Sequence, residues 1–339
     1  MKLLIITQKV DKNDPILGFF HRWIQEFASQ IEQVTVIGQF VGEYDLPSNV
    51  IVKSLGKEKG KSRMGQILQF WKYQKELRSE YDVVLVHMTP IWVVLGQRLW
   101  KKFNKPVYLW YEARGGGWAL PKALAHVRKV FGATAYGLPL QSAQHVIMGH
   151  GIDTEMFSLP ETPRDPTLVV AIGRITRVKR YDIILKTIAA LPEKYRLEVR
   201  GVTITPSDAD ALQKLMDLRH SLHLEGRVAE VAAATHVQIP ALLKKASLFL
   251  HAAEGGLDKA ILEAMSCGCP VVTSSRAARG VLPEECVATE DTMAAKANAV
   301  LALSSEKREE LGKRLRQIVL ENHSLSRLVE RMITEMQPK

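Results

Sequence analysis

The sequence has few cysteines and no glycine-rich dinucleotide signature, and each absence argues against a class of protein. The three cysteines are odd in number, and Cys267 and Cys269 are nearly adjacent, which argues against a disulfide framework and for a reducing compartment. The Cys-Gly-Cys stretch lacks the partner residues of a zinc site, so we expect buried thiols. No GxGxxG follows the first predicted strand, which argues against a nicotinamide site.

Long apolar runs are also missing. The first run, Leu3 to Ile6, is too short for a signal peptide or a membrane span, and no later run is long enough. We therefore expect a cytoplasmic protein. With 339 residues, the chain is long enough for two domains with large cores.

Positive charge is in excess, with a net charge of +10 that lies mostly in the first half. It gathers in two clusters, Lys53, Lys57, Lys59, Lys61, Arg63 and Arg98, Lys101, Lys102, Lys105. Because Trp100 and Phe103 interleave the second cluster, it suits an anionic membrane surface. Nucleic acid is a rival partner, but no nucleic-acid motif appears, and we expect no such partner. A merely solvated charge run remains the third reading.

Short apolar strands alternate with helices in both halves. The first half predicts strands at residues 2–7, 34–37, 82–86, 106–110 and 145–148, and a helix at 19–31. After the linker-like cluster Pro160, Pro163 and Pro166, the second half predicts strands at 168–172, 197–200, 248–250 and 270–273, and helices at 181–190, 259–267 and within 290–336. This predicts an α/β protein of two doubly wound, Rossmann-like parallel-sheet domains, residues 1–160 and 161–321, that face an interdomain cleft.

The most informative stretch is residues 248–274, a strand–glycine loop–helix–strand unit. Asp258 stands at the N-cap position, so the helix start offers free N–H groups and a positive dipole end to an anion. Gly255 and Gly256 allow close backbone approach, and Glu263 is placed to accept two ribose hydroxyls. The alternative is an ordinary crossover with Asp258 as a cap and Glu263 on the surface.

A basic loop, residues 173–180, follows the strand at 168–172. Arg174 can grip two phosphate oxygens and Lys179 adds a point charge, so together with the helix start they would hold a diphosphate. No DxD-like carboxylate pair and no His/Asp cluster has ligand spacing. We therefore expect no metal and no cofactor.

The first half offers weaker candidates. Gly18, in the loop after the first strand, is a candidate to bind the donor, and His21 lies among aromatic residues at the start of the next helix. Aromatic residues there suit a sugar or lipid site, or simple core packing. His87 and Glu112 follow two further strands at their carboxyl ends, where open α/β sheets bind ligands.

These motifs together resemble a family 4 retaining glycosyltransferase with the GT-B fold. The resemblance is carried by GHGIDTEMF, GRITRVK, GLDKAILEAMSCGCPVV and ENHSL, which begin at residues 149, 173, 256 and 321. It implies that Gly173, Arg174 and Lys179 bind the donor diphosphate, that Glu263 holds the ribose, and that Gly256, Leu257, Asp258 and Lys259 meet the sugar and phosphate. It also implies that the last helix, residues 322–339, packs back onto the first domain.

Two departures from the family pattern concern groups that contact the sugar. Glu254 and Glu263 are separated by one residue more than in the family motif, so either Glu254 reaches the sugar as a catalytic residue or Asp258 replaces it. A His that usually contacts the sugar is replaced by Glu112, with His87 or His21 as candidates to compensate.

The sequence thus predicts transfer of a hexose from a nucleotide diphosphate sugar to a glycolipid, lipid-linked sugar or other saccharide acceptor at the inner face of the cell membrane. GDP-mannose is favoured over UDP-glucose and UDP-N-acetylglucosamine, with the base read by residues 201–205 and 228–239. The alternatives are a non-catalytic binder of sugar nucleotides or anionic lipid, and a sugar-nucleotide epimerase of the same fold.

Overall fold

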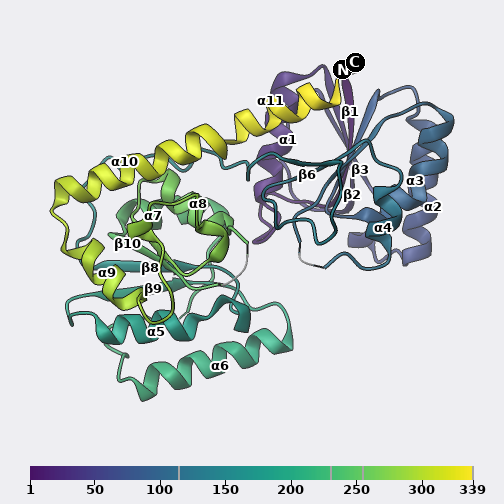
Figure 1. Cartoon of the computed structure of the whole chain (residues 1–339). Coiled ribbons are helices and arrows are strands. Elements are labelled where there is room, and N and C mark those ends of the chain that lie inside the picture. The colour runs from purple at the N-terminus through teal and green to yellow at the C-terminus, as the bar shows by residue number, and fades with distance from the viewer. Residues whose placement is uncertain (114, 230, 254–255, 338–339) are drawn as a thin grey trace. The chain divides into compact units, whose positions relative to one another are not determined.

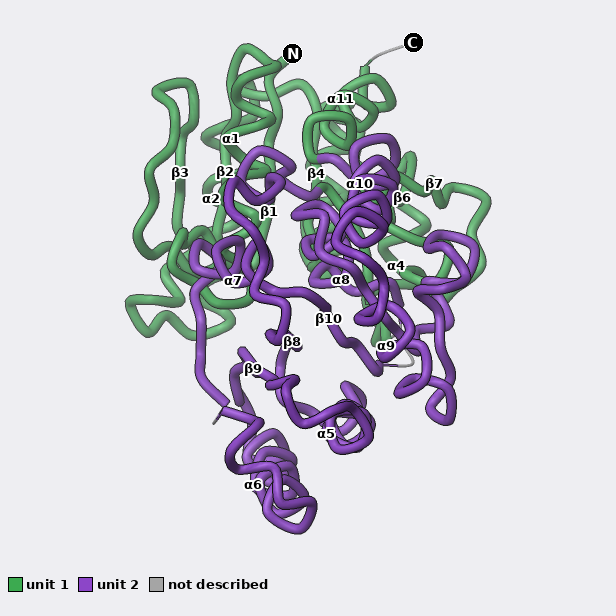
Figure 2. The backbone as a smooth tube through the Cα atoms, turned by 90° about the vertical axis from the view of Figure 1, so that its left-hand side faces the viewer, with its two compact units in different colours: residues 1–151, 325–339 green, residues 152–324 purple. Residues whose placement is uncertain are grey.

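The computed structural model describes residues 1–113, 115–229, 231–253 and 256–337, which form two compact units (Figures 1 and 2). Unit 1 comprises residues 1–151 and 325–339, and unit 2 comprises residues 152–324. The sequence analysis placed the divisions near residues 160 and 322, and the contacts place them after residues 151 and 324. Unit 1 is therefore discontinuous, because the end of the chain returns to it.

Unit 1 is built on a seven-stranded parallel sheet of order β3-β2-β1-β4-β5-β6-β7. Its strands are β1 (Lys2–Val10), β2 (Gln33–Val41), β3 (Val50–Ser54), β4 (Val83–His87), β5 (Val107–Trp110), β6 (Lys129–Gly132) and β7 (His145–Ile147). Its helices are α1 (Phe19–Gln30), α2 (Arg63–Glu76), α3 (Pro90–Lys102), α4 (Ala119–Leu124) and α11 (Leu325–Met336).

Both faces of this sheet are buried, as the continuous apolar run of β1 predicts. Leu3 and Ile5 point into one hydrophobic cluster, and Leu4 and Ile6 point into the other, because side chains alternate along a strand. The first cluster also holds Trp23 of α1 and the apolar face of α11. The last helix therefore completes the core of unit 1 beside α1 (Figure 1).

Unit 2 has a four-stranded parallel sheet of order β11-β10-β8-β9. Its strands are β8 (Leu168–Ile172), β9 (Arg196–Arg200), β10 (Leu248–His251) and β11 (Val271–Thr273). Its helices are α5 (Tyr181–Ala190), α6 (Pro206–Ser221), α7 (Ile239–Lys245), α8 (Lys259–Ser266), α9 (Met293–Ala302) and α10 (Ser305–Asn322). The strand order reverses between β8 and β10, because β9 lies on one side of β8 and β10 lies on the other.

Three details differ from the sequence prediction. Strand β1 runs to Val10, so residues 8–10, which were expected in a loop, belong to the strand, and Lys9 and Val10 pair with β2. The helical stretch 290–336 is three helices, and Ser304 caps α10 by accepting a hydrogen bond from the Lys307 backbone N–H over 3.3 Å. The prediction that Trp100 lies on an exposed basic and aromatic face of α3 is wrong, because this side chain is 1% exposed.

The Trp100 indole N–H instead donates to Gln74 Oε1 over 2.7 Å inside unit 1, so this ring packs in the core. The three cysteines are free and buried, as expected for thiols, and burial raises the pKa of Cys267 to about 12. Among the described residues, no helix is both long enough and apolar enough to cross a bilayer.

Candidate functional site

The candidate site lies in unit 2, at the edge where β8 and β10 end. Parallel strands present their carboxyl ends at one edge, and the crevice between strands whose connections run in opposite directions is the usual ligand site of an open α/β sheet. The loop 173–180 leaves β8 there, and the segment that begins α8 leaves β10 there. The two motifs identified from sequence therefore meet at one edge.

The loop after β8 has a defined path. Gly173 has φ +149°, a backbone conformation that L side chains rarely adopt, and Arg180 is left-handed with φ 48° where the chain enters α5. The Tyr181 hydroxyl donates to the Gly173 carbonyl over 3.0 Å and closes the loop. Arg174 and Lys179 are thus carried on a loop held at both ends.

Lys179 and Asp258 join the two motifs directly. The Lys179 ammonium forms an ion pair with Asp258 Oδ2. Asp258 occupies the N-cap position of α8, as predicted, but its side chain makes no capping hydrogen bond. The carboxylate is therefore engaged with the basic loop, and the first-turn N–H groups of α8 are not satisfied by it.

Asp258 Oδ2 also lies 2.7 Å from His251 Nε2, at the end of β10. Burial raises the pKa of Asp258, but the charge and hydrogen bonds of His251 and Lys179 outweigh it and hold that pKa well below the usual range. The carboxylate is thus ionised over the whole physiological range. His251 is a member of the site that the sequence analysis missed.

Arg174 has a different partner. Its guanidinium binds the Asp208 carboxylate in a two-point arrangement, Nε to Oδ2 at 2.8 Å and Nη2 to Oδ1 at 3.1 Å. Asp208 also accepts from the backbone N–H groups of Ile204 and Thr205 at the start of α6. The Arg174 hydrogen bond, followed by these N–H groups, holds the pKa of Asp208 well below its usual range although burial opposes the shift.

Glu263 lies one turn into α8 and is 7% exposed, so the reading as a surface residue is wrong. Its Oε1 lies 3.1 Å from His236 Nε2. His236 stands in a short turn, His236–Gln238, within residues 228–239 that were predicted to read the base. His236 was not singled out from sequence.

Of the remaining candidates for donor binding, Gly256, Leu257 and Lys259 lie in unit 2 and Gly18 lies in unit 1. Glu254 and Gly255 lie outside the described residues. The Gly256 carbonyl accepts a hydrogen bond from Ser275 Oγ over 3.2 Å, and Leu257 is buried in the core of unit 2. Lys259 begins α8. Gly18 belongs to unit 1, where a Cβ would lie 2.5 Å from the Asp14 carbonyl oxygen, so glycine is required by close packing.

Two buried hydroxyls near the site have no hydrogen-bond partner within the part of the chain that the structure describes. Among the described residues, the buried atoms without one include Thr176 Oγ1 and Ser274 Oγ. Thr176 lies in the loop after β8 and Ser274 follows β11, so both stand at the carboxyl edge of the sheet. Buried hydroxyls without partners are costly, which makes these two candidates for contact with a ligand.

The unit 1 candidates each have a separate partner within unit 1. His87 Nδ1 lies 3.1 Å from Thr7 Oγ1, and the His87 ring stacks on Phe20. His21 Nε2 accepts from the Asp45 backbone N–H over 3.0 Å, and burial lowers its pKa. Their roles toward a sugar or acceptor stay predictions.

Glu112 binds the backbone that follows β6. Its Oε2 accepts from the Ala133 N–H over 2.6 Å and from the Thr134 N–H over 3.2 Å, and Oε1 accepts from the Thr134 hydroxyl. These bonds tie the end of β5 to the next connection. Glu112, which stands where the resemblance leads us to expect a histidine, therefore has a structural role in unit 1.

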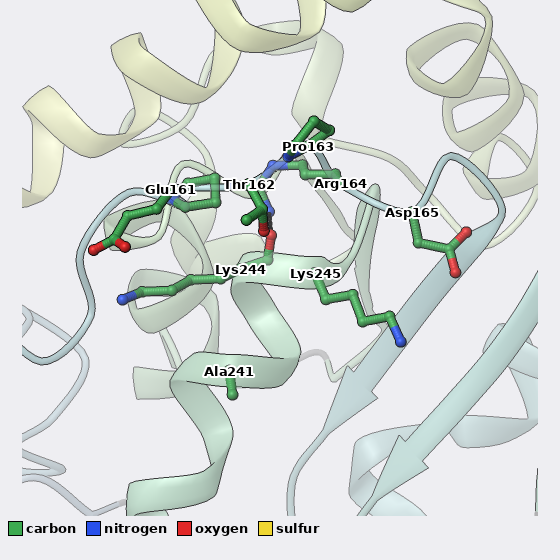
Figure 3. Close-up of a pocket in the computed structure, with 9 residues that line it drawn as sticks. Glu161, Thr162, Pro163, Arg164, Asp165, Ala241, Lys244 and Lys245 are labelled. Atoms are coloured by element: carbon green, nitrogen blue, oxygen red, sulfur yellow. Dashed lines mark hydrogen bonds between the residues drawn. The ribbon is translucent and has the colours of Figure 1, made fainter.

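A cavity of about 580 Å³ lies at the opposite edge of unit 2 (Figure 3). It is formed by the linker stretch 160–165 and by Ala241, Lys244 and Lys245 of α7. The Asp165 N–H donates to the Lys245 carbonyl just before β8 begins, so this cavity is at the amino end of the strand. Its position is the wrong one for a ligand of the 173–180 loop.

Metal ligands do not gather in the part of the chain that the structure describes. No group of three or more His, Cys, Asp or Glu residues with the arrangement of a metal site occurs there. The expectation of a metal-independent site stays a prediction.

Comparisons with known proteins agree with this arrangement. Residues 166–306 match the family model of Glycosyl transferases group 1, a stretch that contains the β8 loop and α8. No curated protein sequence matches the chain.

Solved structures extend the likeness to both units. HepE of Anabaena in complex with UDP and glucose has a TM-score of 0.78 and 16% identity over 99% of each chain. Sucrose-phosphate synthase of Thermosynechococcus elongatus has a TM-score of 0.75 and 16% identity over 99% of this chain and 98% of that chain. A glycosyltransferase of Rickettsia africae has a TM-score of 0.75 and 10% identity over 99% and 97%.

The two parallel-sheet units thus have the GT-B fold. The resemblance seen in the sequence agrees with the match of residues 166–306 to the family model of Glycosyl transferases group 1.

Proposed function

We propose that the chain is a glycosyltransferase that moves a hexose from a nucleoside diphosphate sugar to a hydroxyl acceptor, with the donor bound by unit 2. The observation that carries the proposal is the meeting of Lys179, Asp258 and the start of α8 at the carboxyl edge of β8 and β10. This edge lies within the stretch that matches group 1 glycosyl transferases.

The chemistry follows from the charges. When the glycosidic bond breaks, negative charge grows on the β-phosphate. The Lys179 ammonium, the Arg174 guanidinium and the first-turn N–H groups of α8 attract that charge more strongly as it develops, which lowers the barrier. Arg174 and Lys179 are each paired with a carboxylate in the free protein, so a donor shares or displaces these partners.

We further propose that transfer proceeds with retention and without a metal. The acceptor hydroxyl attacks from the face that the nucleotide leaves, and the phosphate takes its proton, so no protein nucleophile is needed. The cationic groups of Arg174 and Lys179 supply the counter-charge that a divalent ion supplies elsewhere. Full activity in excess EDTA supports this, and dependence on Mg²⁺ or Mn²⁺ contradicts it.

Two donors are the main candidates. The sequence favours GDP-mannose, whereas HepE, a neighbour in fold, was solved with UDP-glucose. We expect Glu263 to accept the ribose hydroxyls of either donor, and the contact of its Oε1 with His236 near the start of α8 supports this role.

The decisive variants are Arg174→Ala and Lys179→Ala. Each removes one charged donor, and we expect a loss of about 10² to 10³ in turnover with GDP-mannose or UDP-glucose and a saccharide or lipid-linked acceptor. Product formation is measured with a labelled donor. Near-normal turnover in both variants contradicts the proposal.

A matched control is Arg196→Ala. Arg196 also pairs with a carboxylate, Asp165, but it stands at the amino end of β9, at the edge away from the site. We expect this variant to keep its turnover. Release of free sugar or conversion of the donor without an acceptor would indicate a hydrolase or an epimerase instead.

We also propose that a lipid-linked acceptor is met at an anionic membrane, through α2 in unit 1. Met64, Leu68 and Trp71 recur at helical spacing, and their exposed fractions are 61%, 58% and 37%. Gln66, Phe70 and Gln74 occupy the buried side of the same helix. These three exposed apolar residues are called the α2 face below.

Cations border the α2 face. The exposed basic residues nearby in the chain are Lys57, Lys59, Lys61, Arg63, Lys72 and Lys75. An apolar strip bordered by lysines suits the surface of an anionic bilayer, where the apolar side chains enter the headgroup boundary and the ammonium groups meet lipid phosphates.

A further inference from the structure

A chain of hydrogen bonds leads from β11 to the Lys179 ammonium. The Ser275 N–H donates to Thr273 Oγ1 over 3.0 Å, and Thr273 Oγ1 lies 3.0 Å from His251 Nδ1. His251 Nε2 lies 2.7 Å from Asp258 Oδ2, the oxygen that also accepts from Lys179 Nζ. Thr273 and His251 are register partners on neighbouring strands, so the sheet itself fixes this link.

The partners assign the protons. An ionised carboxylate only accepts, so His251 Nε2 carries a hydrogen and donates it to Asp258. Thr273 Oγ1 already accepts the Ser275 N–H, which leaves its hydroxyl hydrogen for His251 Nδ1. With a hydrogen on Nε2 and with Nδ1 as the acceptor, His251 has a partner for each of its ring nitrogens.

Burial restricts the motion of the residues in this series of hydrogen bonds. Thr273 is fully buried and His251 is 4% exposed, whereas Lys179 reaches the solvent at the end of the chain. Among the residues that the structure describes, the charged groups that face Asp258 are the Lys179 ammonium and, when protonated, His251. The neighbouring Tyr181 hydroxyl is turned to the Gly173 carbonyl.

The use of Asp258 is unusual for its position. An aspartate at an N-cap normally accepts from the N–H groups of the first helical turn. Here its carboxylate bonds a lysine and a histidine from two other segments, and no capping bond forms. The carboxylate thus fixes a cation beside the start of α8.

We propose that Thr273, His251 and Asp258 are positioning residues that hold the Lys179 ammonium in place for the diphosphate of the donor. This inference rests on the proposed function of the same site. The sequence leaves open whether Glu254 or Asp258 contacts the sugar. The proposal favours Glu254, because it assigns Asp258 to Lys179 and not to the sugar.

The advantage is preorganisation. A free lysine side chain samples many rotamers, and ordering it when the donor binds costs entropy. A lysine already held by a fixed carboxylate has lost that freedom before the donor arrives. Its charge then meets the phosphate without reorganisation.

The first test needs no ligand. The rate at which an amine-acylating reagent modifies Lys179 is followed by peptide mass spectrometry in the wild type, in Asp258→Asn and in Thr273→Val. We expect acylation about tenfold faster in Asp258→Asn, the equivalent of one lost charge-assisted hydrogen bond, and a smaller increase in Thr273→Val. Valine keeps the shape of threonine in a buried strand, so this variant removes only the hydroxyl.

Lys214, an exposed lysine of α6, is the internal reference and should react at the same rate in all three proteins. Asp217→Asn, on the same helix, is the matched control for the loss of a carboxylate and should leave Lys179 unchanged. An unchanged Lys179 rate in Asp258→Asn overturns the inference. An effect of Asp258→Asn without any effect of Thr273→Val overturns the contribution of Thr273 and His251.

The second test is a double-mutant cycle on nucleotide affinity, measured by calorimetry with UDP and GDP. If Asp258 acts through the lysine, Asp258→Asn weakens binding in the wild type and causes no further loss in Lys179→Met. An equal loss in both backgrounds places Asp258 in direct contact with the donor and overturns the inference. If the wild type binds neither nucleotide, the proposed function fails, whereas the acylation rates still decide the positioning.

Discussion

Asp208 and Asp258 both have pKa values below the usual range, for different reasons. The pKa of Asp208 is lowered by the Arg174 guanidinium and by the backbone N–H groups of Ile204 and Thr205 just before α6. The pKa of Asp258 is lowered by His251 and Lys179 against the effect of burial. In both cases a cation of the 173–180 loop is tied to another segment of unit 2. The loop conformation is therefore sensitive to acid.

We predict that Asp208→Asn flattens the acid sensitivity of unit 2. The carboxylate has a lower pKa in the folded state than its ordinary value of about 3.9, so its stabilisation is present above that value and is lost as the pH falls through the folded pKa. The asparagine variant should be less stable than the wild type at neutral pH and should lose less stability on acidification. Urea midpoints at neutral pH and in steps below about pH 4 measure this.

Asp217→Asn is the control for this prediction, because Asp217 accepts from a neutral partner, Gln213, on an exposed face of α6. It should follow the wild-type pH profile. Parallel profiles for Asp208→Asn and the wild type would contradict the assigned cause of the pKa shift.

Sequence reasoning found the charged residues of the site but not their partners. Arg174, Lys179 and Asp258 stand at recognisable positions of a loop and a helix start, so their shared edge could be predicted from strand order alone. His251 and His236 could not, because a single histidine has no local pattern. Its meaning comes from strand pairing and from segments distant in the chain.

At the scale of elements, prediction was best where strands are buried on both sides. The bounds of β8 and α5 match the predicted ranges. The short run of apolar, mostly β-branched residues in β8 fits only a strand, and the apolar residues of α5 recur at a spacing that fits only a helix. β3, β6 and α6 were missed. They are short or half-buried, and α6 has few buried residues. On α3, charge and aromatic residues alternated in sequence, but Trp100 faces the core.

Helix α2 carries a prediction of its own. Protein that carries Met64→Ser and Leu68→Ser should co-float with vesicles of mixed phosphatidylcholine and phosphatidylglycerol at least about tenfold less than the wild type, since two exposed apolar side chains are lost. Flotation is measured at low and at about 0.5 M salt, where screening should weaken the wild type also. Vesicles of phosphatidylcholine alone should bind little.

Tyr136→Ser is the matched control, because Tyr136 is 72% exposed in unit 1 but is not part of the α2 face. It should bind vesicles as the wild type does. If both proteins bind equally well to both vesicle types, the α2 face is not a membrane surface. A concentration-dependent dimer that the double variant loses would identify a second copy as its occupant.

The whole molecule offers a test of the donor. A nucleotide that binds the native protein raises the unfolding temperature in proportion to ln(1 + [L]/Kd). We predict a rise with GDP or UDP and none with ADP, and the larger shift identifies the base of the donor. Lys179→Met should reduce the shift. Equal shifts with all three nucleotides would contradict a specific donor site.

The return of α11 to unit 1 bears on how the chain is made. The nascent protein emerges from the ribosome with its amino end first, so all of unit 2 is synthesised before the residues that complete unit 1. Until then the surface of α1 around Trp23 lacks the cover that Leu328 and Met332 provide in the finished protein. Unit 2 can therefore fold while the chain is still being translated, whereas the core of unit 1 is complete only after α11 has been synthesised, and its exposed apolar surface is until then a candidate for binding by a chaperone.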